Sequence, residues 1–144
     1  AGQSPSAAPV VDSTNGTLAF NVAASTTTPH IFYFQLFAIY GTSAATAPNM
    51  TITLNLGTTA NGWYRYVCDS AGTTAASGAI STTAATISGI PTVLNNDQTC
   101  MIEGMVRLPS NTAQITPFVQ VTSSSTSKNV ILRKGSTLLV RNIL

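Results

Sequence analysis

Side chains that could carry acid–base chemistry are few in this chain. His30 is the only histidine, and the carboxylates are Asp12, Asp69, Asp97 and Glu103. A general acid–base pair needs two titratable groups held close together, but these five are scattered along 144 residues. The weaker alternative is a cation held by Asp69 and Asp97 near predicted strand ends. The sequence therefore predicts no catalytic centre and no bound cofactor or metal, and we expect a protein that is not an enzyme.

Two cysteines are the next reactive groups. Cys68 and Cys100 show none of the sequence spacings that hold a metal ion. Each lies in a predicted strand, where a single cysteine usually serves as a small buried hydrophobic residue. We favour that role, and the sequence leaves open whether the two pair as a disulfide.

Charge is scarce throughout the chain. Charged residues make up 7% of it, against about 25% in a typical domain. No basic residue precedes Arg65, so the first half carries no basic arm for nucleic acid. No secretory signal or membrane-spanning stretch is visible, so we expect synthesis in a host cytoplasm and no membrane partner. A surface this poor in charge has little protection against association, which favours a role inside a permanent assembly.

The element predicted to organise the fold is the apolar stretch from His30 to Tyr40, HIFYFQLFAIY. Its aromatic and isoleucine content favours a strand over a helix. Side chains alternate between the two faces of a strand, and here both faces are apolar. Ile31, Tyr33, Gln35, Phe37 and Ile39 share one face, and Phe32, Phe34, Leu36, Ala38 and Tyr40 share the other. One face should meet an opposing sheet, and the other should meet another subunit.

Strand patterns recur along the rest of the chain, with turn signals such as Asn61-Gly62 between them. The predicted strands cover 17–23, 50–56, 63–69, 100–108, 114–121, 128–133 and 137–144. Pro117 suits a sheet edge or a bulge, and the Ala-, Ser- and Thr-rich segment 70–85 fits a long loop or a weak edge strand. About eight to ten short antiparallel strands without an amphipathic helix predict an all-β sandwich. We expect residues 1–16 to form an extended N-terminal arm and 17–144 to form the domain.

Two groups of side chains could contact other molecules. Glu103 and Arg107 share one face of the strand at 100–108 and should meet opposite charges across a strand pair or a subunit contact. Trp63 and Tyr64 follow the predicted turn at Asn61-Gly62. Alternating aromatic residues in a strand usually anchor a core or an interface, which is the favoured role, and stacking on a glycan is the alternative.

The order of elements in the second half resembles a known family. Ile102-Glu103-Gly104 leads through a turn to a strand that bears Gln120, and Gly135-Ser136 precedes the final apolar strand with Leu138-Leu139-Val140. This order is similar to the C-terminal half of the tumour-necrosis-factor-like (complement-globular-head-like) jelly rolls of tailed-phage structural proteins. The similarity runs loosely over residues 17–144, and the family has a fuller strand where residues 70–85 lie.

The resemblance implies a jelly-roll β-sandwich that forms a homotrimer. It further implies a structural virion protein, a capsid decoration (cement) protein on the outer surface of a phage head, with the major capsid protein as its partner. The residues expected at the trimer interface are Tyr33, Phe37, Ile39, Glu103 and Arg107. The residues expected to hold the arm on the capsid are Pro5, Pro9, Val10 and Val11. The alternative is a receptor-binding or adhesion head of a phage fibre, with Trp63 and Tyr64 stacking on carbohydrate.

Overall fold

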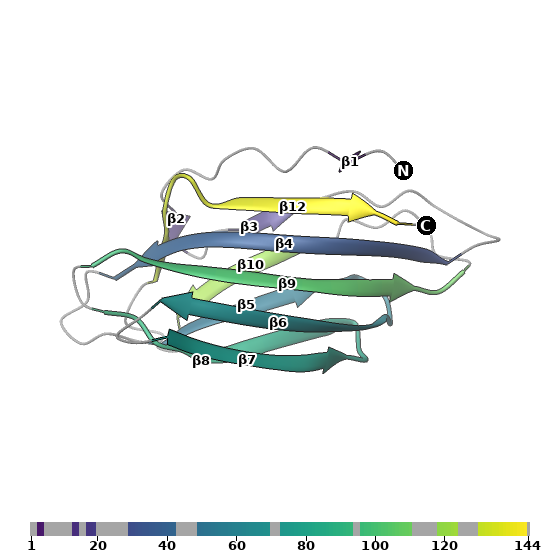
Figure 1. Cartoon of the computed structure of the whole chain (residues 1–144), viewed down its shortest axis with the longest axis horizontal. Helices are drawn as coiled ribbons and strands as arrows, with labels where there is room; N and C mark the ends of the chain where they lie inside the picture. Colours follow the sequence, from purple (N-terminus) through teal and green to yellow (C-terminus); the bar gives the residue numbers. More distant parts are fainter. Residues whose placement is uncertain are drawn as a thin grey trace.

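The strands predicted from alternating apolar residues form two antiparallel sheets that pack face to face (Figure 1). The computed structural model describes residues 3–4, 13–14, 17–19, 29–42, 49–69, 73–93, 96–110, 118–123 and 130–143. The strands are β1 (Gln3–Ser4), β2 (Ser13–Thr14), β3 (Thr17–Ala19), β4 (His30–Gly41), β5 (Met50–Asn55), β6 (Asn61–Asp69), β7 (Thr73–Ile80), β8 (Ala84–Ile90), β9 (Gln98–Leu108), β10 (Phe118–Ser123), β11 (Ile131–Leu132) and β12 (Thr137–Asn142). The all-β prediction is confirmed. Among the described residues, no helix is long and apolar enough to cross a membrane.

The two sheets are built from nested strand pairs. The larger sheet has the order β1-β12-β4-β9-β6-β7, with β11 joining β4 to β2, and the smaller sheet has the order β3-β10-β5-β8. Six antiparallel pairs of the described strands are nested one inside the next, from the ends of the chain to its middle: β1·β12, β2·β11, β3·β10, β4·β9, β5·β8 and the hairpin β6·β7. The innermost pair, β6·β7, extends the larger sheet beyond β9.

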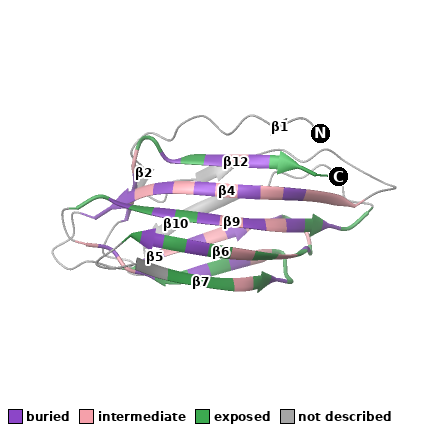
Figure 2. Ribbon diagram, viewed as in Figure 1, coloured by how far each residue is buried: buried purple, intermediate pink, exposed green. Residues whose placement is uncertain are grey.

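Strand β4 is the centre of the larger sheet. It pairs with β9 from His30 to Tyr40 and with β12 on its other side. Its even-numbered side chains point at the smaller sheet and are at most 2% exposed from Phe32 to Tyr40. Its odd-numbered side chains are half-buried on the opposite face (Figure 2). The prediction that only one face of this strand fills the sandwich is confirmed.

The space between the sheets is filled by side chains. The inward residues of β5 and β9 are almost fully buried, among them Met50, Ile52, Ile102 and Leu108. Each fully buried aliphatic side chain stabilises the fold by about 1.5–3 kcal/mol. The apolar cavity that remains in this layer has a volume of about 10 Å³, room for no more than about one water molecule. This cavity is too small for an internal ligand.

Gly104 on β9 makes room for the Phe34 ring in this layer. Its neighbours across the sheet are Phe34 on β4 and Tyr64 on β6. A Cβ atom on Gly104 would lie 2.7 Å from ring carbon Cε1 of Phe34 and would also meet the carbonyl oxygen of Trp63. The glycine of the Ile102-Glu103-Gly104 motif is therefore explained by packing.

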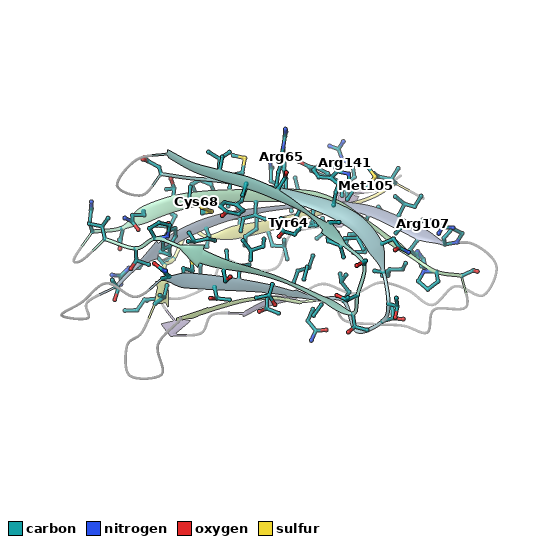
Figure 3. All side chains as sticks on the ribbon, turned by 90° about the horizontal axis from the view of Figure 1, so that it is seen from below. Tyr64, Arg65, Cys68, Met105, Arg107 and Arg141 are labelled. Atoms are coloured by element: carbon teal, nitrogen blue, oxygen red, sulfur yellow. A yellow bond between two sulfur atoms is a disulfide. The ribbon has the colours of Figure 1, made fainter. Side chains whose placement is uncertain are left out.

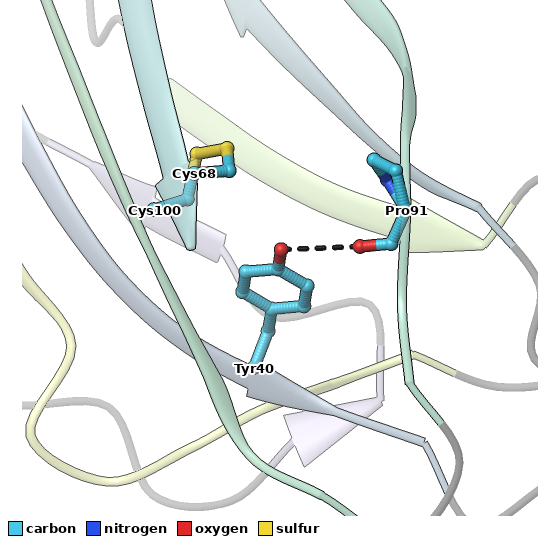
Figure 4. Close-up of a disulfide and its surroundings, with 4 residues drawn as sticks. All are labelled: Tyr40, Cys68, Pro91 and Cys100. Atoms are coloured by element: carbon cyan, nitrogen blue, oxygen red, sulfur yellow. Dashed lines mark hydrogen bonds between the residues drawn. A yellow bond between two sulfur atoms is a disulfide. The ribbon is translucent and has the colours of Figure 1, made fainter. Parts of the chain in front are cut away.

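Cys68 and Cys100 form a disulfide between β6 and β9 (Figure 4). The two residues stand directly opposite each other in the strand register, with Cα atoms 4.0 Å apart. The favoured interpretation of two separate buried thiols is therefore wrong. Both cysteines are buried as predicted, but the register of β6 against β9, which the sequence does not show, brings them together.

Tyr40 and Ser136 form hydrogen bonds at the C-terminal end of β4. The Tyr40 hydroxyl donates a hydrogen bond to the carbonyl of Pro91 (3.1 Å), in the segment that follows β8 (Figure 4). The buried Ser136 hydroxyl accepts a hydrogen bond from the N–H of Ile39 (2.9 Å) and donates to the carbonyl of Arg133 (2.8 Å). Gly135 before it has a φ of 96°, a conformation that glycine adopts without strain. The Gly135-Ser136 motif thus fastens the start of β12 to β4.

Three local predictions have different outcomes in the structure. The Ala-, Ser- and Thr-rich segment contains the edge strand β7, so the edge-strand alternative is confirmed and the long loop is wrong. Asn61-Gly62 is not a turn but the start of β6, where Gly62 lies against the backbone of Met105. Strand β10 begins after Pro117 and lies between β3 and β5, so it is not an edge strand. Pro117 itself lies outside the described residues.

Two short pieces of the predicted arm pair with this chain's own sheet. Gln3–Ser4 pairs with Arg141 and Val140 of β12, and Ser13–Thr14 pairs with β11. The residues expected to hold the arm on a capsid, Pro5, Pro9, Val10 and Val11, lie outside the described residues. Their contact with a capsid stays a prediction.

Candidate functional site

The candidate site is the face of the larger sheet that points away from the smaller sheet, called the outer face below. Alternation along β4, β6, β9 and β12 places every second side chain on it. Its members are Ile31, Tyr33, Gln35, Phe37, Ile39, Asn61, Trp63, Arg65, Val67, Asp69, Thr99, Met101, Glu103, Met105, Arg107, Thr137, Leu139 and Arg141.

Exposed hydrophobic side chains of the described residues gather on this face. The four large ones are Trp63 (41% exposed), Val67 (50%), Met101 (44%) and Ile143 (46%). Trp63 and Val67 lie on β6, next to Met105 and Met101 of β9. Ile143 continues β12 beside β4, where its N–H bonds to the carbonyl of Ile31 (2.7 Å), and with Tyr33 it lines a shallow hollow. A contiguous exposed apolar patch marks an interaction surface.

A polar group lies in the middle of this apolar surface. The carboxylate of Glu103 accepts hydrogen bonds from the hydroxyl of Tyr33 on β4 and from the guanidinium of Arg65 on β6, which also forms its salt bridge. The Glu103 side chain is 15% exposed, whereas that of Arg65 is 65% exposed. Glu103 is therefore covered by its partners, while Arg65 keeps most of its surface available to another molecule.

The Tyr33 and Glu103 pKa values move in opposite directions. The hydrogen bond from Tyr33, followed by that from Arg65, holds the pKa of Glu103 below its usual value. Burial, followed by the hydrogen bond to Glu103, raises the pKa of Tyr33. Glu103 is thus ionised and Tyr33 protonated at neutral pH, so the group keeps one negative charge beside Arg65.

All five residues predicted for the trimer interface lie on the outer face. Tyr33, Phe37 and Ile39 come from β4, and Glu103 and Arg107 come from the adjacent β9. Glu103 meets its opposite charge, Arg65, across a strand pair of the same chain. Arg107 lies opposite Ile31 and Asn61 at the end of the sheet and has no ion pair among the described residues.

The two residues predicted for glycan stacking do not share a face. Trp63 lies on the outer face, whereas Tyr64 points between the sheets and packs against the core (Figure 3). The Tyr64 hydroxyl covers Gly78, where a Cβ atom would lie 2.5 Å from its oxygen. Consecutive residues of a strand alternate in direction, so this pair cannot form one stacking platform.

Arg65, Val67 and Met101 are the site residues that the sequence did not single out. Alternation along the strand at 63–69 is the signal that could have placed Arg65 and Val67 on the same face as Trp63. The sequence could not show that this face continues across β9 to Tyr33 and Phe37, because that depends on strand order. Figure 3 shows Arg65 and Arg141 projecting from the same side of the sheet.

The remaining titratable residues lie at strand ends. His30 begins β4 opposite Leu108. Asp69, at the exposed end of β6, and Asp97, just before β9, line one shallow hollow, and Asp97 accepts a hydrogen bond from Arg133 Nε (2.9 Å). Within the described part of the chain, no group of three or more His, Cys, Asp and Glu residues is placed to hold a metal ion.

Comparisons with known proteins gave no match: no protein-family model matches the chain, and neither does any curated protein or solved structure.

Proposed function

We propose that this chain is a structural virion protein, a homotrimeric decoration (cement) protein that binds the outside of a tailed-phage capsid and bridges coat subunits. The observation that carries the proposal is the outer face, where the exposed large hydrophobic side chains surround the Tyr33–Glu103–Arg65 group. A face of this kind is stabilised when a second protein surface covers it.

The nested strand pairing supports a jelly roll. A jelly roll is a two-sheet fold of eight strands that combines two Greek keys, and it can be described as a long antiparallel ribbon wound into a sandwich. Here six nested pairs of described strands run from the chain ends to the hairpin β6–β7, and from β3·β10 inward neighbouring pairs lie in alternate sheets. The hairpin β6–β7 is the tip of this ribbon, and it widens the outer face by the row from Asn61 to Asp69.

The outer face has the makeup of a subunit contact. Aromatic residues, methionine and arginine are enriched in protein interfaces, and Trp63, Met101, Met105 and Arg65 lie together here. A stable contact buries about 800 Å² on each partner, which is the scale of a face spanning four strands. A closed ring of three copies would bury part of this face on every subunit.

The disulfide supports a location outside a reducing cytosol. Disulfides persist on secreted proteins and on virion surfaces, and they are rare in cytosolic proteins. The Cys68–Cys100 bond is buried between β6 and β9. A protein made in a host cytoplasm would then form this bond on or after release of the virion.

Solution mass tests the trimer. The wild-type protein should elute with the mass of three chains in chromatography coupled to light scattering, and Met101→Asp should convert it to single chains. Thr86→Asp is the matched control, because it adds the same charge at an exposed position of β8 on the smaller sheet. A single-chain wild type, or a Met101→Asp variant that keeps the mass of three chains, would refute the proposed interface.

Binding to capsids tests the decoration role. When purified protein is added to capsids that lack it, each capsid should bind hundreds of copies. The bound protein should raise the temperature at which the capsids open. A protein found only in a few copies at the tail would refute decoration.

The exposed ring of Trp63 is the one observation that favours the second candidate, a receptor-binding head. Binding to host cells that disappears in Trp63→Ala while the trimer persists would establish that function in place of decoration.

A further inference from the structure

Strand β7 forms a free edge of the larger sheet. It pairs with β6 on one side, and no other described strand pairs with it on the other side. Along this strand, Ala75, Ala76, Ser77 and Ala79 are exposed, so side chains on both faces reach solvent. In Figure 1, β7 is the last strand of its layer.

The other edges among the described strands carry the features that prevent pairing with foreign strands. Natural edges are kept short, bulged or covered. The strands β1, β2 and β3 have only two or three residues each. Strand β8 has a register shift against β5, a glycine at φ 77° and a following Pro91. Strand β7 has eight residues, TTAASGAI, with no charge, no proline and no register shift.

The backbone groups that face the free edge can be assigned from the ladder. The bond from Ile143 N–H to the Ile31 carbonyl shows that odd-numbered residues of β4 bond toward β12. Bonding direction alternates along an antiparallel strand, and the pairings β4·β9, β9·β6 and β6·β7 contain no register shift. Even-numbered residues of β7 therefore bond to β6. The N–H and C=O groups directed at the free edge belong to Thr73, Ala75, Ser77 and Ala79.

We propose that β7 pairs antiparallel with β7 of a second copy of this chain, so that the two larger sheets continue into each other across a two-fold axis. An identical edge is self-complementary under a two-fold rotation. The exposed side chains on β7 are small and uncharged, so two copies approach without steric clash or like-charge repulsion.

The register of the β7·β7 pair is fixed if the backbone groups of all four residues that face the free edge form hydrogen bonds. Directly opposite residues of an antiparallel pair lie on the same face of the sheet, and hydrogen-bonded pairs exchange two bonds. Thr73 opposite the partner's Ala79, and Ala75 opposite the partner's Ser77, satisfies every free group. The two-fold axis then passes between Ala76 and the partner's Ala76.

This contact rests on the proposed function and deepens it. A ring of three copies uses the outer face and leaves the β7 edge at its periphery. Pairing of β7 edges would then join neighbouring trimers across two-fold positions of a capsid, so the decoration layer would be held together laterally as well as to the coat.

Cysteine cross-linking tests the pairing and its register. Ala76→Cys in the full chain should form an intermolecular disulfide under mild oxidation, with most chains running as dimers on a non-reducing gel. In the same register the two Ser77 Cα atoms lie diagonally, beyond the roughly 7 Å that a disulfide spans, so Ser77→Cys should cross-link much less. Thr86→Cys is the control, at an exposed position of β8 on the smaller sheet. Cross-linking of Ala76→Cys no greater than that of Thr86→Cys, or weaker than that of Ser77→Cys, would overturn the inference.

Solution mass separates this inference from the proposed trimer. A wild-type mass that rises above three chains as the concentration increases, while Ser77→Lys stays at three chains, supports both contacts. Two chains that fall to one support the β7 pairing and refute the trimer. Three chains in both proteins, with no cross-link at Ala76, refute the β7 pairing and leave the trimer standing.

Discussion

Removing the Cys68–Cys100 disulfide should destabilise the domain strongly. The two residues are separated by 32 positions, and the chain-entropy model gives a loop of that length about 3.7 kcal/mol of stabilisation at 25 °C. Unfolding entropy is about 2.1 cal/mol/K per residue, and the chain has 144 residues. The variant that combines Cys68→Ala with Cys100→Ala should therefore melt about 12 °C lower than the wild type.

Single substitutions distinguish a disulfide from two independent buried side chains. If the bond exists, Cys68→Ala alone and Cys100→Ala alone each remove it, so each should lose nearly as much stability as the double variant. Two separate thiols would instead give small losses that add. Urea unfolding followed by circular dichroism measures the free energy of all four proteins.

Three outcomes would refute this reasoning. The first is a double variant within about 1 kcal/mol of the wild type, below the usual 2–5 kcal/mol for a native disulfide. The second is additivity of the two single losses. The third is alkylation of both cysteines in denatured protein that has not been reduced.

Three further substitutions test the packing and the polar group. Glu103→Gln should lower the free energy of unfolding by about 1 kcal/mol at pH 7. The wild type should lose that advantage as pH falls below about 4.5, because the pKa of Glu103 is depressed in the folded state, and urea unfolding at pH 7 and pH 3 measures both effects. Gly104→Ala should lower stability by about 1–3 kcal/mol, because its Cβ would meet the Phe34 ring. Ser136→Ala should lower it by about 1–3 kcal/mol, since the Ile39 N–H loses its partner, and thermal melts measure both.

One exposed substitution serves as the control for these three. Thr99→Ala changes an exposed residue of β9, and its stability should stay within about 0.5 kcal/mol of the wild type. An equal pH dependence in Glu103→Gln and the wild type would contradict the role of that carboxylate. Losses in Gly104→Ala or Ser136→Ala no larger than the control's would contradict their packing and hydrogen-bonding roles.

The sequence by itself determined the local character of the main strands. The alternation in β4, β5 and β9 predicts their inward residues, because a strand sends successive side chains to opposite faces and one face must leave water. The same alternation separates Tyr33, Phe37 and Ile39 from the even-numbered residues of β4, but both faces of this strand are apolar, and only the packing of the two sheets shows which face points outward. The low content of charged residues and the absence of helical periodicity were sufficient to predict the all-β class.

Predictions of turns and loops from short stretches of sequence were wrong where pairing with a strand distant in sequence determined the local structure. Asn61-Gly62 has the composition of a tight turn, yet it begins β6, because Gly62 lies against the backbone of Met105 on β9. The turn falls earlier, near Gly57, whose φ is 71°. The segment with β7 has few apolar residues to bury, and it becomes a strand because β6 supplies hydrogen bonds along its whole length.

Only the tertiary structure decided which side chains meet. Cys68 bonds with Cys100, and Arg65 binds Glu103, because β6 adds to β9 in one register that brings residues 32 and 38 positions apart into contact. A shift of that register by one residue would send one member of each pair to the opposite face. Strand order likewise carries the outer face from Tyr33 to Trp63, and among the described strands it leaves one edge of β7 without a partner. Such pairings are set by the combined burial of both sheets, and no short stretch of sequence contains that information.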